Sequence, residues 1–324
     1  MDEILPGGED EYEYDLPISL RTSVWRDIGE ITQGESGESA LVPIKYPPGF
    51  DYCFRLMRVL VGRGELSERG LELSEEAISR NAASYEAWWY RRRCLENLGA
   101  DVEEEKYCVD QWTRDMPKNY QVWYHRKWVL DKLGIFEGEL EFLDEMLRED
   151  AKNYNAWQMR LWVLNRVGTW ADELPFVDQK IMEDCRNNSA WAHRRAVLER
   201  LFEKPLPSDV VEAEISYACG QISFAPHNEC PWNYLLGFVR QEGDDPKATE
   251  RLSAYKLPSV VGDTVEDVLK GHPECRFALE AKAKIAALRQ DGPTAIALFR
   301  KLQEVDPVRK YYWMIREKAL TKKT

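Results

Sequence analysis

The stretch Pro117-Lys-Asn-Tyr-Gln-Val-Trp-Tyr-His-Arg126 decides the fold, because variants of it recur along the chain. Each copy, here called a repeat phrase, places Asn or Ser four residues before a Trp. The tryptophans are Trp88, Trp123, Trp157, Trp191 and Trp232, spaced by 35, 34, 34 and 41 residues. A period of about 34 residues is typical of stacked helical hairpins. The sequence therefore predicts a solenoid, which usually works by presenting an extended concave surface to a partner.

Each repeat is expected to hold two helices. The first starts at the Asn or Ser of the phrase and runs about 14 residues, and the second fills the gap before the next phrase. Leu140, Leu143 and Leu147 form the apolar stripe of one such second helix. No stretch alternates in the manner of a strand. We therefore expect an all-α fold, a right-handed superhelical crescent of about seven antiparallel hairpins.

Composition predicts one domain preceded by a flexible arm. Residues 1–45 form an acidic N-terminal arm and an extended segment, because residues 1–15 carry seven acids and no base. Residues 46–324 form a single domain that includes a polar break at 241–247. Helices are expected near 51–62, 68–80, 274–289, 293–304 and 308–318. The repeat phrases and their helices lie near 84–98, 119–133, 153–167, 187–201 and 228–241.

Charge and cysteine usage exclude several function classes. With 44 Lys and Arg against 57 Asp and Glu, the net charge of −13 argues against a nucleic-acid partner. No apolar run approaches the length of a membrane span. The seven cysteines are scattered and form no C-x-x-C pair, which favours a reducing, cytoplasmic location. His272-x-x-Cys275 lacks a second half, so no metal site is expected in this chain.

The residue types of the phrase suit a scaffold. Asn or Ser suits a helix N-cap, and the Trp one turn later is expected to wedge between hairpins. An Arg follows three residues after four of the tryptophans and is expected to bind carbonyl ends of a neighbouring helix or to stack on an indole. His125 and His193 each lie two residues after a Trp, in equivalent packing positions. A catalytic group is rarely needed once per repeat, so this recurrence favours structure.

A second set of positions, five residues before each Trp, is here called the basic column. Its members are Ala83, Lys118, Lys152, Arg186 and His227. They fall in the turn just before each phrase helix, where the helix N-terminus favours anions. The column therefore predicts a site for a phosphate-type ligand. The alternative is that these bases are only solvated turn residues.

The phrases resemble the repeat of protein prenyltransferase α subunits, in particular those shared by protein farnesyltransferase and protein geranylgeranyltransferase type I. The resemblance covers roughly residues 24–320, and Val24-Trp-Arg-Asp-Ile-Gly29 is similar to the first segment of the family. The most telling segments are Pro117–Arg126, Asp150–Gln158, Arg186–Trp191 and Pro226–Tyr234. The tetratricopeptide signature, a Trp followed by Leu-Gly and a Tyr, is missing.

The resemblance implies a helical crescent wrapped around a separate β subunit. In this family the β subunit supplies a catalytic zinc and most of the isoprenoid pocket. The enzyme joins farnesyl or geranylgeranyl diphosphate to the Cys of a C-terminal CaaX motif in proteins such as small GTPases. The resemblance leaves open the isoprenoid length and whether Mg²⁺ joins the diphosphate.

The resemblance also implies roles for single residues. Lys152 matches the family lysine that approaches the diphosphate and is the expected catalytic residue. Tyr154 matches a tyrosine beside that site, and Tyr120 holds the same position one repeat earlier. Asn155 stands where the family often has a Gln that binds the CaaX carboxylate. Scaffold and partner-interface roles are expected for Asn119, Asn153, Asn187, Trp191, Arg160, Arg194, Lys118, Arg186 and His193.

Two alternatives remain from the sequence. A repeat protein with a basic column is also suited to be a non-catalytic adaptor that grips acidic peptides. The α subunit of Rab geranylgeranyltransferase has similar repeats, although animal versions carry extra domains for which this chain has no room.

Overall fold

The structure, a computed structural model, describes residues 16–29, 31, 46–202, 205–238 and 257–321. Within these residues every regular element is a helix and no strand occurs, so the predicted all-α class is confirmed. The acidic stretch at 1–15, most of the segment that leads to residue 45 and the polar break at 241–247 lie outside the described residues.

The chain divides into two compact units. The first comprises Met1–Met146 and Gln158–Val163, and the second comprises Leu147–Trp157 and Leu164–Thr324. Helices α6 (Glu139–Glu149) and α7 (Tyr154–Val167) carry residues of both units. The organisation of residues 46–324 as a single domain stays a prediction.

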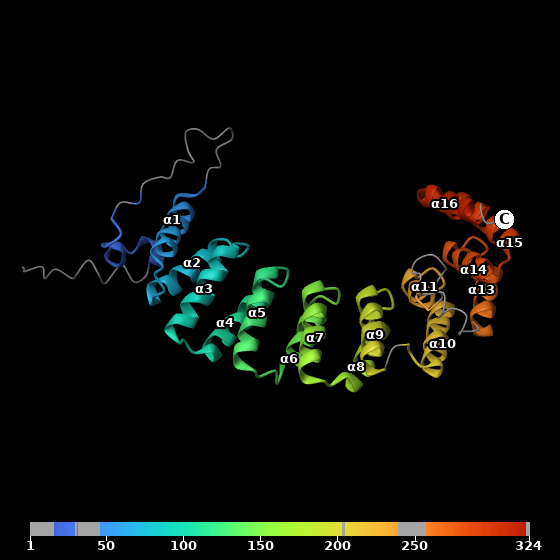
Figure 1. Ribbon diagram of the computed structural model, residues 1–324, viewed down its shortest axis with the longest axis horizontal. Coiled ribbons are helices and arrows are strands. Elements are labelled where there is room, and N and C mark those ends of the chain that lie inside the picture. The colour runs from blue at the N-terminus through green and yellow to red at the C-terminus, as the bar shows by residue number, and fades with distance from the viewer. Residues whose placement is uncertain (1–15, 30, 32–45, 203–204, 239–256, 322–324) are drawn as a thin grey trace, which may run out of the picture. The chain divides into compact units, whose positions relative to one another are not determined.

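The first unit is built from successive helices that pack in pairs (Figure 1). Helix α2 packs on α3 and helix α4 packs on α5. The hairpin therefore joins each phrase helix to the helix before it, whereas we expected the helix after it. The reason is the turn before the phrase helix, because the Trp88 indole binds the carbonyl of Ala82 in that turn. The helices are α1 (Pro48–Arg63), α2 (Glu68–Arg80), α3 (Tyr85–Leu98), α4 (Val102–Asp115) and α5 (Tyr120–Leu133).

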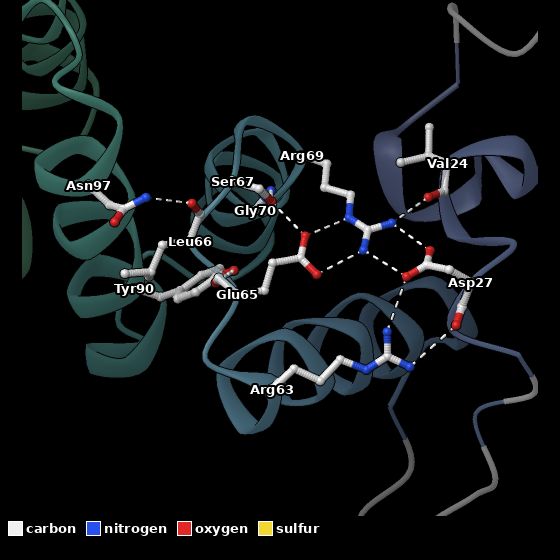
Figure 2. A network of polar contacts seen from close by, with 10 residues as sticks. All are labelled: Val24, Asp27, Arg63, Glu65, Leu66, Ser67, Arg69, Gly70, Tyr90 and Asn97. Carbon is white, nitrogen blue, oxygen red and sulfur yellow. Dashed lines mark hydrogen bonds and ion pairs between the residues drawn. The ribbon is translucent and has the colours of Figure 1, made fainter.

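Polar contacts from several residues attach the N-terminal segment of the first unit, and Arg69 is the centre of one network of them. Residues Ile18–Leu20 (η1) and Thr22–Trp25 (η2) form short 3-10 helices, with Trp25 buried. Arg69 on α2 donates to the Val24 carbonyl at 2.7 Å and to both carboxylate oxygens of Asp27 at 2.7 and 3.0 Å (Figure 2). It also binds both oxygens of Glu65. These hydrogen bonds from Arg69 lower the pKa of Asp27 to about 2, so the carboxylate stays charged.

The second unit continues the same pattern of paired helices. Helix α8 packs on α9, α10 on α11, α13 on α14 and α15 on α16. Phe299 and Trp313 lie in a buried cluster that closes the C-terminal end. The elements are η3 (Trp170–Asp172), α8 (Glu173–Glu183), α9 (Asn188–Leu201), α10 (Ser208–Phe224), α11 (Glu229–Leu236), α13 (Ser259–Gly271), α14 (Arg276–Leu288), α15 (Gly292–Val305), η4 (Pro307–Arg309) and α16 (Lys310–Thr321).

Three phrase helices end at a glycine. Gly99, Gly134 and Gly168 follow α3, α5 and α7 with φ values of 61°, 67° and 78°. This left-handed conformation is strained for residues that carry a Cβ, and it turns the chain sharply toward the next helix. The glycines thus set where each turn begins.

Candidate functional site

The phrase asparagines cap the helices that follow them. Oδ1 of Asn119 accepts hydrogen bonds from the backbone N–H groups of Gln121 and Val122, and Oδ1 of Asn187 accepts from those of Ser189 and Ala190. Asn153, Asn228 and Ser84 cap α7, α11 and α3 in the same way. The predicted capping role is confirmed.

Asn119, Asn187 and Asn228 also donate a hydrogen bond to a turn carbonyl of the preceding repeat. The Cys185 carbonyl accepts the indole N–H of Trp191 at 3.0 Å and the side-chain amide of Asn228 at 2.7 Å. The Ala151 carbonyl likewise accepts from Trp157 and from Asn187. One turn carbonyl thus accepts a hydrogen bond from the Trp of the helix that follows it and another from the Asn of the next repeat. This bond fixes the spacing of the turns that carry the basic column.

The basic column lies on the surface. All five members, from Ala83 to His227, are exposed and occupy the turns before the phrase helices. The tyrosines next to the caps, Tyr120 and Tyr154, are also exposed. The sequence therefore placed these side chains correctly at helix N-termini, where backbone N–H groups favour anions.

In the described part of the chain, the Lys152 side chain forms an ion pair with Asp184. Its Nζ lies 2.9 Å from Oδ2 of Asp184, and the side chains of Lys152 and Asp184 are 55% and 40% exposed. The hydrogen bond from Lys152 lowers the pKa of Asp184, so this carboxylate is an anion at neutral pH. Asp184 was not among the residues singled out from the sequence.

Asn155 is buried, unlike Lys152 and Tyr154. Its backbone N–H donates to the Asn153 cap at 2.9 Å, and the residue is only 8% exposed, whereas Tyr154 is 61% exposed. The three residues 152, 154 and 155 thus sit together at the start of α7. A ligand on this surface meets Lys152 and Tyr154 before it meets the amide of Asn155.

The phrase arginines bind buried carboxylates, which the sequence analysis did not foresee. Arg126 contacts Glu139 and Asp110, and its guanidinium lies 3.7 Å from the centre of the Phe142 ring. The stacking expected on an indole occurs for Arg91, which lies 4.9 Å over Trp112. Arg160 donates to the Leu140 carbonyl at 3.0 Å, which lies in the first turn of α6 and not at the carbonyl end that we expected.

The same carboxylate pattern recurs in the second unit. Arg194 binds both oxygens of Glu214 and contacts Asp178. The sequence contains a signal for the carboxylate that precedes the base, because the two residues are 16 positions apart in each case. The pairs are Glu75 with Arg91, Asp110 with Arg126, Asp178 with Arg194 and Glu266 with Lys282.

The two phrase histidines are buried, as their equivalent positions predict. Nε2 of His125 lies 2.6 Å from Glu105, and Nε2 of His193 lies 2.7 Å from Glu173. Among the described residues, Nδ1 of each ring has no hydrogen-bond partner. Burial lowers the pKa of His125 and outweighs the opposing effect of Glu105, so His125 is neutral and donates through Nε2. Burial raises the pKa of Glu105, but hydrogen bonds from His125 and Arg91 outweigh this and lower it to about 2.

The repeat continues past the last phrase in a form that the sequence analysis missed. Cys275 is the N-cap residue of α14, and its Sγ lies 3.4 Å from the Pro226 carbonyl, in the place of a phrase asparagine. Leu279 then stands at the Trp position, and Lys282 at the Arg position pairs with Glu266. Because other residues stand at its Asn, Trp and Arg positions, this phrase was not recognised in the sequence.

The described residues hold neither a metal-ligand cluster nor a helix suited to span a membrane. No group of three or more His, Cys, Asp or Glu side chains suited to hold a metal ion occurs among them. None of the helices in this part of the chain has the length and apolar character of a membrane span. All seven cysteines are free thiols, and burial raises the pKa of Cys53 to about 12.

Comparison with known proteins agrees with this geometry. The protein prenyltransferase alpha subunit repeat matches residues 67–98, 102–133, 136–167 and 170–201, which frames each repeat as the structure does. The protein farnesyltransferase/geranylgeranyltransferase type-1 subunit alpha of Pisum sativum is 35% identical over 97% of this chain and 98% of its own length. The subunit of the same name from Schizosaccharomyces pombe is 49% identical over 64% of this chain and 70% of its own length.

A solved structure extends the likeness to three dimensions. A chain from the Candida albicans protein geranylgeranyltransferase-I complexed with GGPP matches with a TM-score of 0.72 and 28% identity, over 87% of this chain and 94% of that chain. The relative from Pisum sativum matches nearly end to end. This chain therefore belongs to the family of protein farnesyltransferase/geranylgeranyltransferase type-1 alpha subunits.

Proposed function

We propose that this chain is the α subunit of a cytoplasmic, heterodimeric CaaX protein prenyltransferase that is active only with its β subunit. The thiol sulfur of the CaaX cysteine forms a bond to C1 of the isoprenoid, and the bond from C1 to the diphosphate oxygen breaks. The thiol proton passes to solvent and diphosphate leaves. The end-to-end relationship to named α subunits is the observation that carries this proposal.

The β subunit is proposed to complete the active site. Zinc on that subunit would hold the CaaX thiol as the nucleophilic thiolate. The residues of this chain act on the diphosphate, where negative charge grows as the bond to C1 breaks. Transfer measured with and without added Mg²⁺ tests whether this ion shares that task.

Lys152 is the proposed catalytic residue of this chain. Its exposed ammonium stands at the N-terminal turn of α7, where the helix itself favours anions. An ammonium about 4 Å from a phosphate oxygen is attracted by roughly 4 kcal/mol at an effective dielectric of about 20, and desolvation reduces the net gain. Tyr154 lies beside Lys152 and is proposed to line the same site, with Tyr120 at the equivalent place one repeat earlier.

Asn155 is proposed to bind the CaaX terminal carboxylate through its side-chain amide. The residue is largely buried, and its side chain is one methylene shorter than the family Gln. The carboxylate must therefore approach closely or bind through a bridging water, which costs little in enthalpy.

Assembly with a β subunit tests the function directly. The chain is co-expressed with a candidate farnesyltransferase β subunit, purified by size exclusion, and assayed with a CaaX peptide and each isoprenoid diphosphate. We expect a 1:1 complex with zinc-dependent transfer, and no transfer by this chain alone. If the chain stays monomeric with every β subunit tested and binds acidic peptides, the non-catalytic adaptor function is established instead.

The role of Lys152 needs its own variant. Lys152→Ala in the assembled complex is expected to lower the transfer rate about tenfold or more, because one cation is lost beside the leaving diphosphate. Lys270→Ala is the matched control, since Lys270 is also an exposed lysine paired with one aspartate, Asp267. Wild-type turnover in the Lys152→Ala complex contradicts the catalytic assignment and leaves the subunit assignment intact.

A further inference from the structure

The backbone of its own turn fixes the side chain of Asp184. It follows α8 directly, and its Oδ1 accepts the backbone N–H of Arg186 at 2.8 Å. Asp150 makes the same turn one repeat earlier, where its Oδ1 accepts the N–H of Lys152 at 3.1 Å. Because one oxygen of Asp184 is engaged by the turn, the other points to a fixed place, and Lys152 occupies it.

The pair of Lys152 and Asp184 is open to exchange. Both side chains are about half exposed, and the contact is a single one between Nζ and Oδ2. Exposed ion pairs are weak, because water screens them and two long side chains must be held in one geometry. An anion with several phosphate oxygens therefore competes well for the Lys152 ammonium, which has three hydrogens to donate.

The next member of the basic column lacks such a carboxylate. The position that corresponds to Asp184 in the following repeat is Ala225. The guanidinium of Arg186 has no hydrogen-bond or ion-pair partner within the described part of the chain. Of these two neighbouring bases, Lys152 makes a direct ion pair with Asp184, whereas Arg186 acts on Asp184 only through its charge, and Lys152 is also the proposed catalytic residue.

We propose that Asp184 is a positioning residue that holds Lys152 while the diphosphate site is empty and competes with the diphosphate for it. The inference rests on the proposed function of Lys152. Asp184 aims the ammonium at the site, and it weakens the grip of Lys152 on inorganic diphosphate after transfer. Release of product limits many enzymes, so an anion that returns to the lysine favours turnover.

The direct test is Asp184→Asn in the assembled complex with the β subunit. The Asn amide oxygen still accepts the Arg186 N–H, so the turn is kept and only the charge is lost. The dissociation constant of inorganic diphosphate is measured by titration calorimetry. We expect binding about threefold to fivefold tighter, on the scale of an exposed ion pair. Asp267→Asn, which unpairs Lys270 on α13, is the matched control and is expected to change nothing.

Measuring Asp184→Asn in the Lys152→Ala background distinguishes positioning of Lys152 from direct repulsion of the diphosphate by Asp184. If Asp184 acts through the lysine, Asp184→Asn should lose most of its effect when Lys152→Ala is already present. An equal gain in both backgrounds overturns the inference, because Asp184 then repels the diphosphate directly. Unchanged or weaker binding in the single variant overturns it as well.

The two proposals fail in different ways. A Lys152→Ala complex with wild-type diphosphate affinity and turnover removes the proposed role of Lys152. If diphosphate binding and transfer depend on Lys152 but are unchanged by Asp184→Asn, only the proposed role of Asp184 is refuted.

Discussion

Arg126 and Lys152 are basic residues of successive repeats, yet their surroundings are opposite. Arg126 is fully buried between Glu139 and Asp110, whereas the Lys152 side chain is 55% exposed and meets one carboxylate. A buried charge is tolerated only with partners, so the first arrangement is structural. An exposed pair is weak and exchangeable, so the second is free to serve a ligand. Recurrence of a basic residue in the repeats therefore does not distinguish a scaffold role from a ligand-binding role, whereas burial of its side chain does.

The largest effect is expected where the buried pair is broken. Arg126→Met should lower the free energy of unfolding by about 3 kcal/mol, because Glu139 and Asp110 lose their buried cation. The value lies at the low end for such changes, since Lys106 also contacts Glu139 at 2.9 Å. Denaturant unfolding followed by circular dichroism measures it.

The double variant Arg126→Met with Glu139→Leu is the matched comparison. It removes both members of the buried pair and is expected to be more stable than Arg126→Met alone, since an apolar replacement of a whole pair is often tolerated. If the single and double variants are equally unstable, lost packing on Phe142 rather than an unpaired charge explains the effect.

A smaller effect is expected at the link between repeats. Asn187→Ala removes the cap of α9 and the hydrogen bond to the Ala151 carbonyl, so unfolding should become easier by about 1–2 kcal/mol. Asn188, the exposed asparagine next to it, is the control, and Asn188→Ala should leave the midpoint nearly unchanged. Equal losses in both variants contradict the proposed double role.

The local parts of the repeat were predictable from the sequence. The caps, the buried tryptophans and the terminal glycines each depend on residues within one helix and its turns, so their spacing is visible in the chain. The carboxylates were missed because they come from other helices, as in the 20 residues between Arg194 and Glu214. The buried carboxylates follow their arginines at irregular distances, 14 residues for Glu105, 13 for Glu139 and 20 for Glu214, whereas a cap has a fixed spacing.

The candidate site was predictable in part. The exposed position of Lys152 follows from its place before a cap, and this was expected. Asp184 lies 32 residues further on, in the next turn, and only stacking of the repeats brings it to Lys152. The hidden repeat at Cys275 was missed because thiol, leucine and lysine replace the usual Asn, Trp and Arg.

The buried histidine predicts a pH effect near neutrality. The pKa of His125 lies below its unfolded value of about 6.5, so the unfolded chain binds more protons as the pH falls. The stability that His125 contributes is complete above that pH and is lost below it, by up to about 1.4 kcal/mol per pH unit. Thermal unfolding between pH 5 and 8 measures this loss.

His125→Gln is the informative comparison for that slope. The Gln amide can still donate to Glu105 but cannot take up a proton in this range. Its melting temperature should fall less than that of the wild type between pH 7 and 5. If both proteins show the same fall, other groups carry the pH dependence.

The smallest effect on stability is expected at Lys152. Lys152→Ala should change the free energy of unfolding by less than about 0.5 kcal/mol, because the pair with Asp184 is half exposed and leaves no buried charge behind. Paired measurements of unfolding and transfer on the same preparation decide the point. A loss as large as that of Arg126→Met would mean that Lys152 is scaffold as well, and that a fall in transfer reports damage to the fold. A stable Lys152→Ala complex with slow transfer separates the two bases, since burial then predicts structure and exposure predicts chemistry in successive repeats.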